Sequence, residues 1–528
     1  MRQVVNLDTP LLRLSTNDYF TLRDALQGVS VFGGIGSGKT SGSGAALARA
    51  YLRAGMGGLV LCAKPEEAAL WHRYCAETNR SASLLVIDGN EPGFNFIAYE
   101  LSRHGAAGVN NVIDALMRVL EIARAASPNP GRMGESFWED TTRQILRNAV
   151  PVLYAATGTV RIADLLRLVR EAPTSPEQMR DADWQQRSFF YAMFRRAADR
   201  LDDASGEQAA AYWRHDFATL DAKTRGNIVI SLTTALDRFN HGFLKTLFCE
   251  NTTFVPELSF HGAILLLDMP ALTRNESGII AQQLIKYMWQ RAVLARNGLA
   301  PAHQERPVFL YADECHLFTT TFDAEFQSLC RGSRCCTVFL TQNLPTYYAK
   351  MGGENARDRV HHLLGNFATR IWHNNACDTT NEHAAKTIGR VLQQRGNYSE
   401  NAGSSASYGT SAGGGSNRGS NRSSGATASI SGSGQGPGSS WSYGTTSSRG
   451  TSEGTSSSWG RNHSVGTSQG VSRGYSEAMD WLIEPAEFGR MLKTGGPANG
   501  NIVSAVWYSA SRRFEESRGN ALLVEFRQ

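Results

Sequence analysis

The chain has 528 residues, of which 41% are hydrophobic and 19% charged, and its formal net charge is +5. This length accommodates two or three domains, and the composition is that of a globular protein, which excludes a chain disordered over its whole length. The small positive charge permits contact with nucleic acid but does not argue for it.

Two further features bear on where the protein works. The N-terminal residues 1–8 lack the apolar core of a secretory signal, and the longest apolar runs, such as Ala263–Leu267, are far shorter than the roughly 20 residues that span a bilayer. The eight cysteines are scattered, and Cys330, Cys335 and Cys336 match no usual zinc spacing. We therefore expect reduced thiols and a cytoplasmic protein without a membrane anchor of its own.

Residues 1–28 form a short β-rich lead-in, and the apolar run Val29–Phe32 after it is predicted to be a strand. Residues 33–40 then fit the pattern G-x-x-x-x-G-K-[ST], and the helical stretch Ala45–Ala50 follows, as this motif requires. A chance glycine-rich turn is the alternative interpretation. The predicted nucleotide-binding residues are Gly33, Gly34, Ile35, Gly36, Ser37, Gly38, Lys39, Thr40 and Ser41.

The chemistry that this pattern predicts is the binding of nucleotide phosphates. Its glycines let backbone N–H groups close around the β-phosphate, and the positive end of the following helix adds to the attraction. Lys39 is expected to reach the β- and γ-phosphates of ATP, and Thr40 to coordinate Mg²⁺.

Short apolar strands alternate with helical stretches along much of the chain. Leu59–Cys62 and Leu84–Ile87 precede a long helical interval, whereas Ala263–Leu267, Val308–Ala312 and Thr337–Leu340 follow it. Strands this apolar are typical of a sheet that is buried on both faces. The alternation predicts an α/β fold with a mostly parallel sheet wrapped by helices.

The helical interval shows apolar residues at helical spacing. The pattern is clear over Trp138–Ala156 and Ile162–Arg170, and Trp184–Leu201 is similar. We therefore predict an all-helical insertion over 105–225 within the nucleotide-binding domain.

A second candidate motif closes the apolar run Val308–Ala312. The run ends in Asp313 and Glu314, which is the form of a Walker B strand. Asp313 is expected to hold the Mg²⁺ shell, and Glu314 to orient and polarise the attacking water, which favours hydrolysis over simple binding. The alternative is a solvated loop after a buried strand.

The composition changes sharply near residue 396. Roughly half of positions 396–476 are Gly or Ser, and too few of the remaining residues are apolar to form a core. We therefore predict a flexible, disordered loop. Arginines and aromatics are interspersed, which suits either single-stranded nucleic acid or a passive spacer. These are Arg418, Arg422, Arg449, Arg461 and Arg473, and Tyr398, Tyr408, Trp441, Tyr443, Trp459 and Tyr475. Two strands, Ile502–Tyr508 and Leu522–Phe526, are predicted after this tract.

The predicted organisation has five segments. They are 1–104, N-terminal strands and the first part of a RecA-like nucleotide-binding domain; 105–225, the helical insertion; 226–395, the second part of that domain; 396–476, the Gly/Ser-rich loop; and 477–528, the strands that complete the domain.

These features together resemble the conjugative coupling ATPases of the TraG/TraD type, in the FtsK/HerA superfamily of hexameric DNA pumps. The P-loop and the Asp313-Glu314 pair carry the resemblance, and 63–67 (Ala-Lys-Pro-Glu-Glu) is similar to the family's lysine-plus-acid element. Asp88 followed by 94–97 (Phe-Asn-Phe-Ile) is similar to another family segment, and Thr341-Gln342 ends a strand where the superfamily has a glutamine that senses the γ-phosphate.

The resemblance implies an ATPase that works as a ring of six subunits, with ATP and Mg²⁺ at the interfaces and single- or double-stranded DNA in a central channel. It assigns Gln342 as the sensor. It also implies an arginine donated by the neighbouring subunit, for which Arg331 and Arg370 are the candidates. A planar, permanent charge suits this task because it bridges phosphate oxygens. An ordinary surface ion pair is the alternative for each.

Two departures from the family pattern matter. Family members usually carry transmembrane helices ahead of the P-loop, whereas only residues 1–32 precede it here, and the Gly/Ser-rich tract is unlike the common pattern. Any attachment to the inner membrane is therefore expected to come through partners, such as relaxosome or secretion-channel proteins.

Three functions remain open from the sequence. The first is a DNA translocase for conjugation or a mobile element, and the second is a HerA-like motor that assists a nuclease in DNA processing or defence. The third is a protein-handling secretion ATPase or a nucleotide-gated scaffold. Stimulation of ATP hydrolysis by DNA separates the first two from the third.

Overall fold

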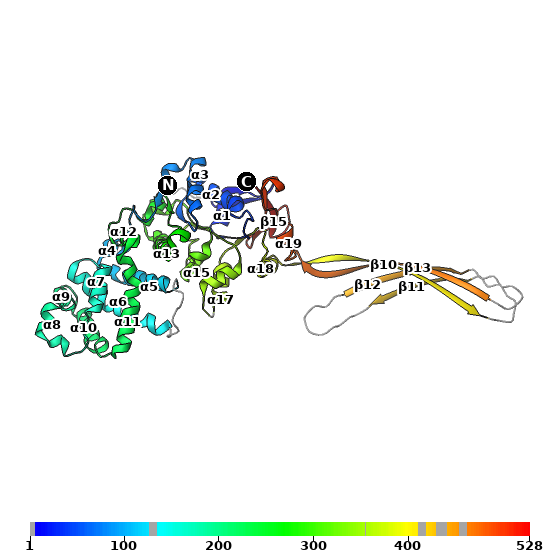
Figure 1. Ribbon diagram of the computed structural model, residues 1–528. Helices are drawn as coiled ribbons and strands as arrows, with labels where there is room; N and C mark the ends of the chain where they lie inside the picture. The colour runs from blue at the N-terminus through cyan, green and yellow to red at the C-terminus, as the bar shows by residue number, and fades with distance from the viewer. Residues whose placement is uncertain (1–5, 126–134, 354, 410–418, 429–440, 453–461) are drawn as a thin grey trace. The chain divides into compact units, whose positions relative to one another are not determined.

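The computed structural model describes residues 6–125, 135–353, 355–409, 419–428, 441–452 and 462–528. The chain divides into two compact units (Figure 1). Unit 1 comprises Met1–Asn381 with Ala486–Gln528, and unit 2 comprises Glu382–Pro485. Each is described by itself.

Unit 1 is built on a nine-stranded sheet with the order β15-β14-β9-β3-β8-β7-β4-β6-β5. The strands β3 through β9 pair in parallel, and β14 pairs antiparallel with both β9 and β15. Their bounds are β3 (Val29–Phe32), β4 (Gly57–Leu61), β5 (Leu84–Ile87), β6 (Ile264–Leu267), β7 (Val308–Ala312), β8 (Cys335–Thr341), β9 (Thr369–Trp372), β14 (Ile502–Ser509) and β15 (Ala521–Arg527). A separate hairpin, β1 (Pro10–Arg13) with β2 (Tyr19–Thr21), precedes the sheet.

The predicted α/β class with a mostly parallel sheet is confirmed. Every residue of β3, β4, β6, β7 and β8 is buried, which explains why these strands are apolar throughout. The order places β8 between β3 and β7, so the carboxyl ends of these three strands meet at one edge of the sheet.

Helices cover the sheet and are held by aromatic packing. On one face, α2 (Ala45–Arg53) and α3 (Pro65–Glu77) share a buried cluster with side chains of the central strands. Trp71 of α3 stacks on Phe309 of β7 with ring centroids 5.7 Å apart. Further helices of this unit are α13 (Ala271–Ala295), α15 (Phe322–Leu329), α16 (Leu344–Met351) and α17 (Ala356–Gly365).

Along the chain, a helical region follows β5 and precedes β6, and Figure 1 labels its helices α4 to α12. Its helices are α4 (Phe96–His104), α5 (Gly108–Ala125), α6 (Glu135–Thr157), α7 (Ile162–Arg170), α8 (Ala182–Arg187), α9 (Phe189–Ala197), α10 (Asp203–Ala211), α11 (Ala222–Asp237) and α12 (Gly242–Cys249). These helices pack around an aromatic core in which the ring of Trp213 lies edge-on to that of Phe190. Nε1 of Trp213 donates a hydrogen bond to the carbonyl of Asn148 at 3.0 Å. The stretch Trp184–Leu201 is not one helix, because Ser188 caps α9 and ends α8. The boundaries of a separate domain in this region stay a prediction.

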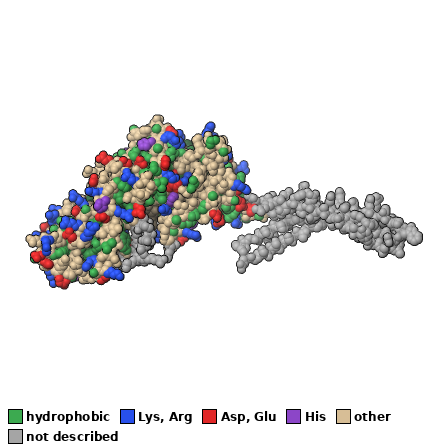
Figure 2. Space-filling view, viewed as in Figure 1, with side chains coloured by type: hydrophobic (Ala, Val, Ile, Leu, Met, Phe, Trp, Pro, Cys, Tyr) green, Lys and Arg blue, Asp and Glu red, His purple; other side chains and the backbone are tan. Residues whose placement is uncertain are grey.

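The eight cysteines are free thiols, and Cys335 and Cys336 are buried on β8, as a packing role requires. In the described residues no single helix is long and apolar enough to cross a membrane, while one pair bent by 118°, Trp138–Thr157 with Ile162–Arg170, meets the criterion by length and composition. Figure 2 shows acidic and basic side chains interspersed over the viewed face of unit 1.

Unit 2 contains the Gly/Ser-rich tract, and the flexibility predicted for that tract stays a prediction. The described residues form an antiparallel sheet with the order β10-β13-β12-β11. The strands are β10 (Arg390–Gly409), β11 (Gly419–Ala428), β12 (Trp441–Ser452) and β13 (Asn462–Trp481). Strand pairing satisfies backbone N–H and C=O groups without an apolar core. Arg418, Trp459 and Arg461 lie outside the described residues.

A buried ion pair joins two helices beside the central strands. Lys286 of α13 contacts Asp323 of α15, donates to the carbonyl of Phe318 at 2.7 Å, and is 1% exposed like its partner. Gln290, the backbone N–H of Thr320 and the Thr320 hydroxyl also donate to the carboxylate. Burial lowers the pKa of Lys286 and the Asp323 charge opposes that shift.

Replacing Lys286 should therefore destabilise unit 1. Lys286→Met leaves Asp323 buried without its cation, and we expect a loss of about 3–5 kcal/mol in the free energy of unfolding. The matched control, Lys493→Met, removes an exposed pair with Glu525 and should stay within about 0.5 kcal/mol of wild type. Thermal and denaturant unfolding measure both, and equal stabilities would show that the buried pair is dispensable.

Candidate nucleotide-binding site

The P-loop joins β3 to a helical turn at the carboxyl edge of the sheet. The backbone N–H of Gly33 donates to Thr341 of β8 at 3.2 Å, and that of Gly34 donates to Asn374 at 2.9 Å. Gly36 and Gly38 have φ angles of +71° and +81°, which residues with a Cβ rarely adopt. The loop is therefore anchored to the end of β8 and to the segment that follows β9, while its tip turns back on itself.

Two of the glycines are needed for close packing as well. A Cβ on Gly33 would lie 2.4 Å from Oγ of Ser37, and one on Gly38 would lie 2.5 Å from a methyl group of Val503 in β14. The side chain of Ile35 at the tip is 90% exposed. The close approach of Val503 to Gly38 shows that β14, near the C-terminus, packs against the loop. Sequence spacing alone did not indicate this contact.

A helical segment begins directly after the loop. Residues Thr40–Gly44 form a π-helical turn (η1) that continues into α2, and Gly44 donates to the carbonyl of Lys39 at 2.9 Å. Ser41 faces the end of the chain, where Nε2 of Gln528 donates to its hydroxyl at 2.6 Å. The strand–loop–helix context predicted for the motif is present.

One carboxylate oxygen at the centre of the site accepts three hydrogen bonds. Oε1 of Glu314 lies 3.2 Å from Nζ of Lys39, 3.0 Å from Nζ of Lys64 and 3.3 Å from Nε2 of Gln342. Glu314 and Lys39 are 3% and 7% exposed. Burial raises the pKa of Glu314, but the two lysines and the glutamine outweigh it and hold that pKa below its ordinary value. The carboxylate is therefore kept ionised in a nearly dry environment.

The backbone of Glu314 is itself unusual. Its φ of +46° places a non-glycine residue in the left-handed region, and its N–H donates to Oδ1 of Asp313 at 2.8 Å. Such conformations cost of order 1–3 kcal/mol and persist only where the surroundings fix them. The turn aims two consecutive carboxylates in different directions.

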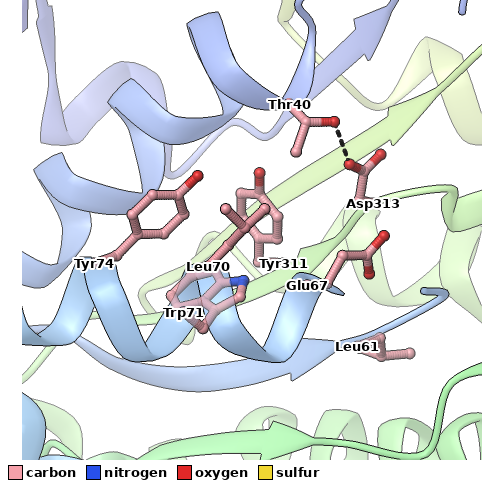
Figure 3. A pocket seen from close by; sticks show the side chains of 8 residues that line it. All are labelled: Thr40, Leu61, Glu67, Leu70, Trp71, Tyr74, Tyr311 and Asp313. Carbon is pink, nitrogen blue, oxygen red and sulfur yellow. Dashed lines mark hydrogen bonds between the residues drawn. The ribbon is translucent and has the colours of Figure 1, made fainter. Parts of the chain in front are cut away.

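The second carboxylate meets the P-loop threonine. Oγ1 of Thr40 donates to Oδ2 of Asp313 at 2.5 Å, as Figure 3 shows. Both groups are ligands that Mg²⁺ accepts. The structure thus brings Thr40, Asp313, Lys39, Glu314 and Gln342 together from three separate parts of the chain.

A third acidic residue, which was not among the predicted site residues, lies beside this pair. Glu67 lines a small pocket with Thr40, Asp313 and Tyr311 (Figure 3). Its Oε2 accepts the N–H of Ala63 at 2.7 Å, while its Oε1 is buried without a hydrogen-bond partner. Burial raises the pKa of Glu67 to about 8, with a further contribution from Asp313. The sequence signal was the acid three residues after Lys64, at the start of α3.

A histidine supports the loop from behind and was also missed. His373 follows β9, is fully buried, and its Nε2 lies 2.7 Å from Oγ of Ser43 in η1. Its backbone N–H donates to Phe32 at 2.8 Å. Burial, with Lys39 nearby, lowers the pKa of His373 to about 3, so the ring is neutral. No motif in the sequence marks a neutral histidine whose partner lies 330 residues away.

The two predicted arginines lie apart from this cluster. Arg331 is exposed in the turn between α15 and β8. Arg370 on β9 is half-buried and donates to the carbonyl of Leu364 at 3.0 Å, and burial lowers its pKa. Neither hydrogen-bonds to Glu314 or Asp313 within the described residues, and a role for either as an arginine donated by a neighbouring subunit stays a prediction.

The residues present suit a nucleoside triphosphate with Mg²⁺. The glycine turn has no room for a Cβ at Gly33 or Gly38, and the buried hydroxyl of Ser37 and Oε2 of Glu314 have no hydrogen-bond partner in the structure. Thr40 and Asp313 supply oxygen ligands, and Lys39 and Lys64 supply positive charge. This donor set fits phosphate oxygens and a hard cation.

Solved structures of a conjugative coupling protein match this chain at low identity, with TM-scores below 0.5. The bacterial conjugative coupling protein TrwBdeltaN70 in its unbound form matches 96% of this chain and 85% of its own, with 12% identity and a TM-score of 0.49. The plasmid coupling protein TrwB with the ATP analogue ADPNP matches 100% and 91%, with 11% identity and a TM-score of 0.47. TrwB with ADP and Mg²⁺ matches 74% and 80%, with 13% identity and a TM-score of 0.44.

No protein-family model matches the sequence, and a search of curated proteins gives no match.

The buried His373 makes a prediction about acid stability. Because its folded pKa of about 3 is below the ordinary value of about 6.5, the unfolded chain takes up the proton first as the pH falls. The free energy of unfolding should then decrease below about pH 6.5 by about 1.4 kcal/mol per pH unit from this group. His373→Gln removes that contribution and should give a shallower acid limb in denaturant unfolding.

The matched control is His362→Gln, at an exposed position on α17. It should reproduce the wild-type slope. If the slope of His373→Gln also matches wild type, His373 is not buried as a neutral base in solution.

Proposed function

We propose that this chain is an ATP-hydrolysing motor that moves DNA. The observation that supports hydrolysis most directly is the convergence of Lys39, Lys64 and Gln342 on Oε1 of Glu314, beside the Thr40–Asp313 pair. A purely nucleotide-binding loop needs the phosphate cradle and a cation. It does not need a buried, ionised carboxylate next to them.

Different residues of the site would have different roles in hydrolysis. Backbone N–H groups of 33–38 and the side chain of Lys39 would hold the phosphates, and Thr40 and Asp313 would hold Mg²⁺. Mg²⁺, when bound, neutralises charge on the phosphate oxygens. Glu314 would accept a proton from water, since its carboxylate is held in the ionised form that has a free acceptor oxygen. Gln342, whose amide already touches that carboxylate, would sense the γ-phosphate.

Movement of DNA is proposed from the sequence resemblance to the TraG/TraD-type coupling ATPases, together with this site. The same resemblance leads us to propose a homo-hexamer in which an arginine from the next subunit completes each site. Exposure of Arg331 favours it over the half-buried Arg370, since a residue that reaches a neighbour has to be accessible. Conjugative transfer is the leading pathway, and the HerA-like motor with a nuclease and the protein-handling ATPase are the alternatives.

Two substitutions should separate binding from turnover. Lys39→Ala removes a cation of the phosphate cradle and should abolish hydrolysis and greatly weaken nucleotide binding. Glu314→Gln keeps the shape but cannot accept a proton, so we expect nucleotide affinity to persist while kcat falls by about 10²–10⁴-fold. Fluorescent-nucleotide titration and steady-state kinetics, with and without single- or double-stranded DNA, measure these effects.

The control for charge is Glu325→Gln, at an exposed position on α15, which should turn over like wild type. Normal turnover in Glu314→Gln would remove this residue from the mechanism. Activity that ignores DNA in the wild-type chain would favour the protein-handling alternative.

A shared site predicts complementation between two inactive variants. Arg331→Ala alone should lower kcat by about 10³–10⁵-fold, the range known for arginine fingers. Mixed with Lys39→Ala, it should regain part of the rate, because some interfaces then combine an intact loop with an intact arginine. The same mixture with Arg370→Ala tests the other candidate, and no recovery in either mixture would argue against a site shared between subunits.

A further inference from the structure

Glu67 lies beside the Thr40–Asp313 pair and has no role in hydrolysis as proposed above. It is the third residue of α3 and is 6% exposed. Its Oε2 accepts the backbone N–H of Ala63 at 2.7 Å, whereas its Oε1 is buried and accepts no hydrogen bond. Buried polar atoms of native proteins nearly always have a partner, so the free oxygen indicates a partner that the chain itself does not supply.

The free oxygen belongs to a carboxyl group that lies next to the proposed cation site. Figure 3 shows the carboxyl groups of Glu67 and Asp313 close together, and Thr40 donates its hydroxyl to Asp313 at 2.5 Å. The charge of Asp313 also acts on Glu67. Two acidic groups that are buried side by side repel each other unless a proton or a cation offsets the repulsion. Their juxtaposition therefore suits a site that a divalent cation occupies.

The pocket that these residues line is about the size of one water molecule. It offers about 10 Å³ to the centre of such a molecule, which is close to the least that one water needs. Its polar lining comes from Thr40, Asp313 and Glu67 with two tyrosines, and the rest of its lining is apolar. A buried water needs several polar partners. A water molecule therefore fits between Glu67 and the two residues that would hold Mg²⁺.

The coordination preference of Mg²⁺ decides what Glu67 would contact. Mg²⁺ keeps several waters in its shell and takes only one or two carboxylates from the protein, together with phosphate oxygens of the substrate. Within the described parts of the chain, no group of three or more His, Cys, Asp or Glu side chains is placed to hold a metal by itself. Glu67 therefore suits a water of the shell better than the cation. Partners of this kind orient the ligands of a metal and tune its affinity.

We propose that Glu67 is a positioning residue of the Mg²⁺ site. Its free Oε1 accepts a hydrogen bond from a water molecule in the shell of the cation that Thr40 and Asp313 hold. This inference rests on the nucleotide site of the proposed function and does not depend on the movement of DNA. The alternatives are that Glu67 binds the cation directly, or that it only caps the start of α3 through Ala63.

Binding of Mn²⁺ tests the contact without measuring hydrolysis. Mn²⁺ takes the place of Mg²⁺ because both prefer oxygen ligands, and electron paramagnetic resonance measures its free concentration. The full chain is saturated with ADP and titrated with Mn²⁺. The variant is Glu67→Gln, whose amide oxygen can still accept the N–H of Ala63. The matched control is Glu66→Gln, which removes an equal charge from an exposed position in the same helical turn.

We expect Glu67→Gln to weaken Mn²⁺ binding by about 10–100-fold, the range for loss of a partner that orients a metal ligand, and Glu66→Gln to leave it unchanged. The affinity for ADP without metal should be the same in both variants and in wild type, because the phosphate cradle is intact. The number of waters on bound Mn²⁺, counted by electron spin echo in D₂O, should also stay the same. The metal-free Glu67→Gln chain should melt at or above the wild-type temperature, since its amide keeps Ala63 and can donate to Asp313.

Four results would each overturn the proposal. The first two are an unchanged Mn²⁺ affinity in Glu67→Gln and an equal loss in Glu66→Gln. One additional water on the Mn²⁺ bound to Glu67→Gln would show that Glu67 is a direct ligand. A lower melting temperature with an equal loss of metal-free ADP affinity would show that its role is only to support the fold.

Failure of this inference is distinguishable from failure of the proposed function. If the wild-type chain binds no Mn²⁺ with ADP, the nucleotide site fails and the inference fails with it. If wild type binds Mn²⁺ and hydrolyses ATP while Glu67→Gln binds Mn²⁺ equally well, only the inference fails. If Glu67→Gln loses Mn²⁺ affinity as expected but the wild-type chain hydrolyses no ATP, the contact stands and the motor does not.

Discussion

The organisation of unit 1 depends on one buried carboxylate, Glu314, which lies between the ammonium groups of Lys39 and Lys64. Burying charges costs several kcal/mol per ion unless their geometry is good, and a left-handed backbone at the same residue adds to the cost. Lys39 comes from the P-loop, Lys64 from the start of α3 and Gln342 from the end of β8. The strands behind these residues have to be correctly ordered before the charges can compensate one another. The charges of Glu314, Lys39 and Lys64 therefore compensate one another only when the strand order of the sheet is correct.

The same dependence explains what the sequence could and could not predict. The bounds of β3, β5 and β7 were predictable because an apolar strand bordered by turns is a local signal, and the P-loop and Asp313-Glu314 adjoin such strands. Glu67 and His373 were not predictable as site residues, because their importance comes from neighbours that only the strand order supplies. The break at Ser188 required its capping hydrogen bond, which competes with helical periodicity.

The Gly/Ser-rich tract exposes a different limit of sequence reasoning. Its composition predicts that it cannot form an apolar core, and an antiparallel ladder needs only backbone groups in register. The alternation in β13, with Gly or Ser at every second position, was present in the sequence throughout. A composition average over 396–476 conceals it, because averaging discards the period of two on which a strand depends.

Within unit 1, the segments that lead into the tract and out of it are bound to the nucleotide site. Asn374 accepts the N–H of Gly34, and Asn375 donates to the carbonyl of Gln342 at 2.8 Å, only a few residues before unit 2 begins. After the tract, the carbonyl of Gly489 accepts a hydrogen bond from the side chain of Asn374 at 2.8 Å. Val503 packs closely against Gly38. A displacement of either segment would therefore have to break hydrogen bonds to the P-loop or to the strand end that carries Gln342. Within unit 1, the residues on either side of the tract thus support the loop that the phosphates would occupy and the strand end that carries Gln342.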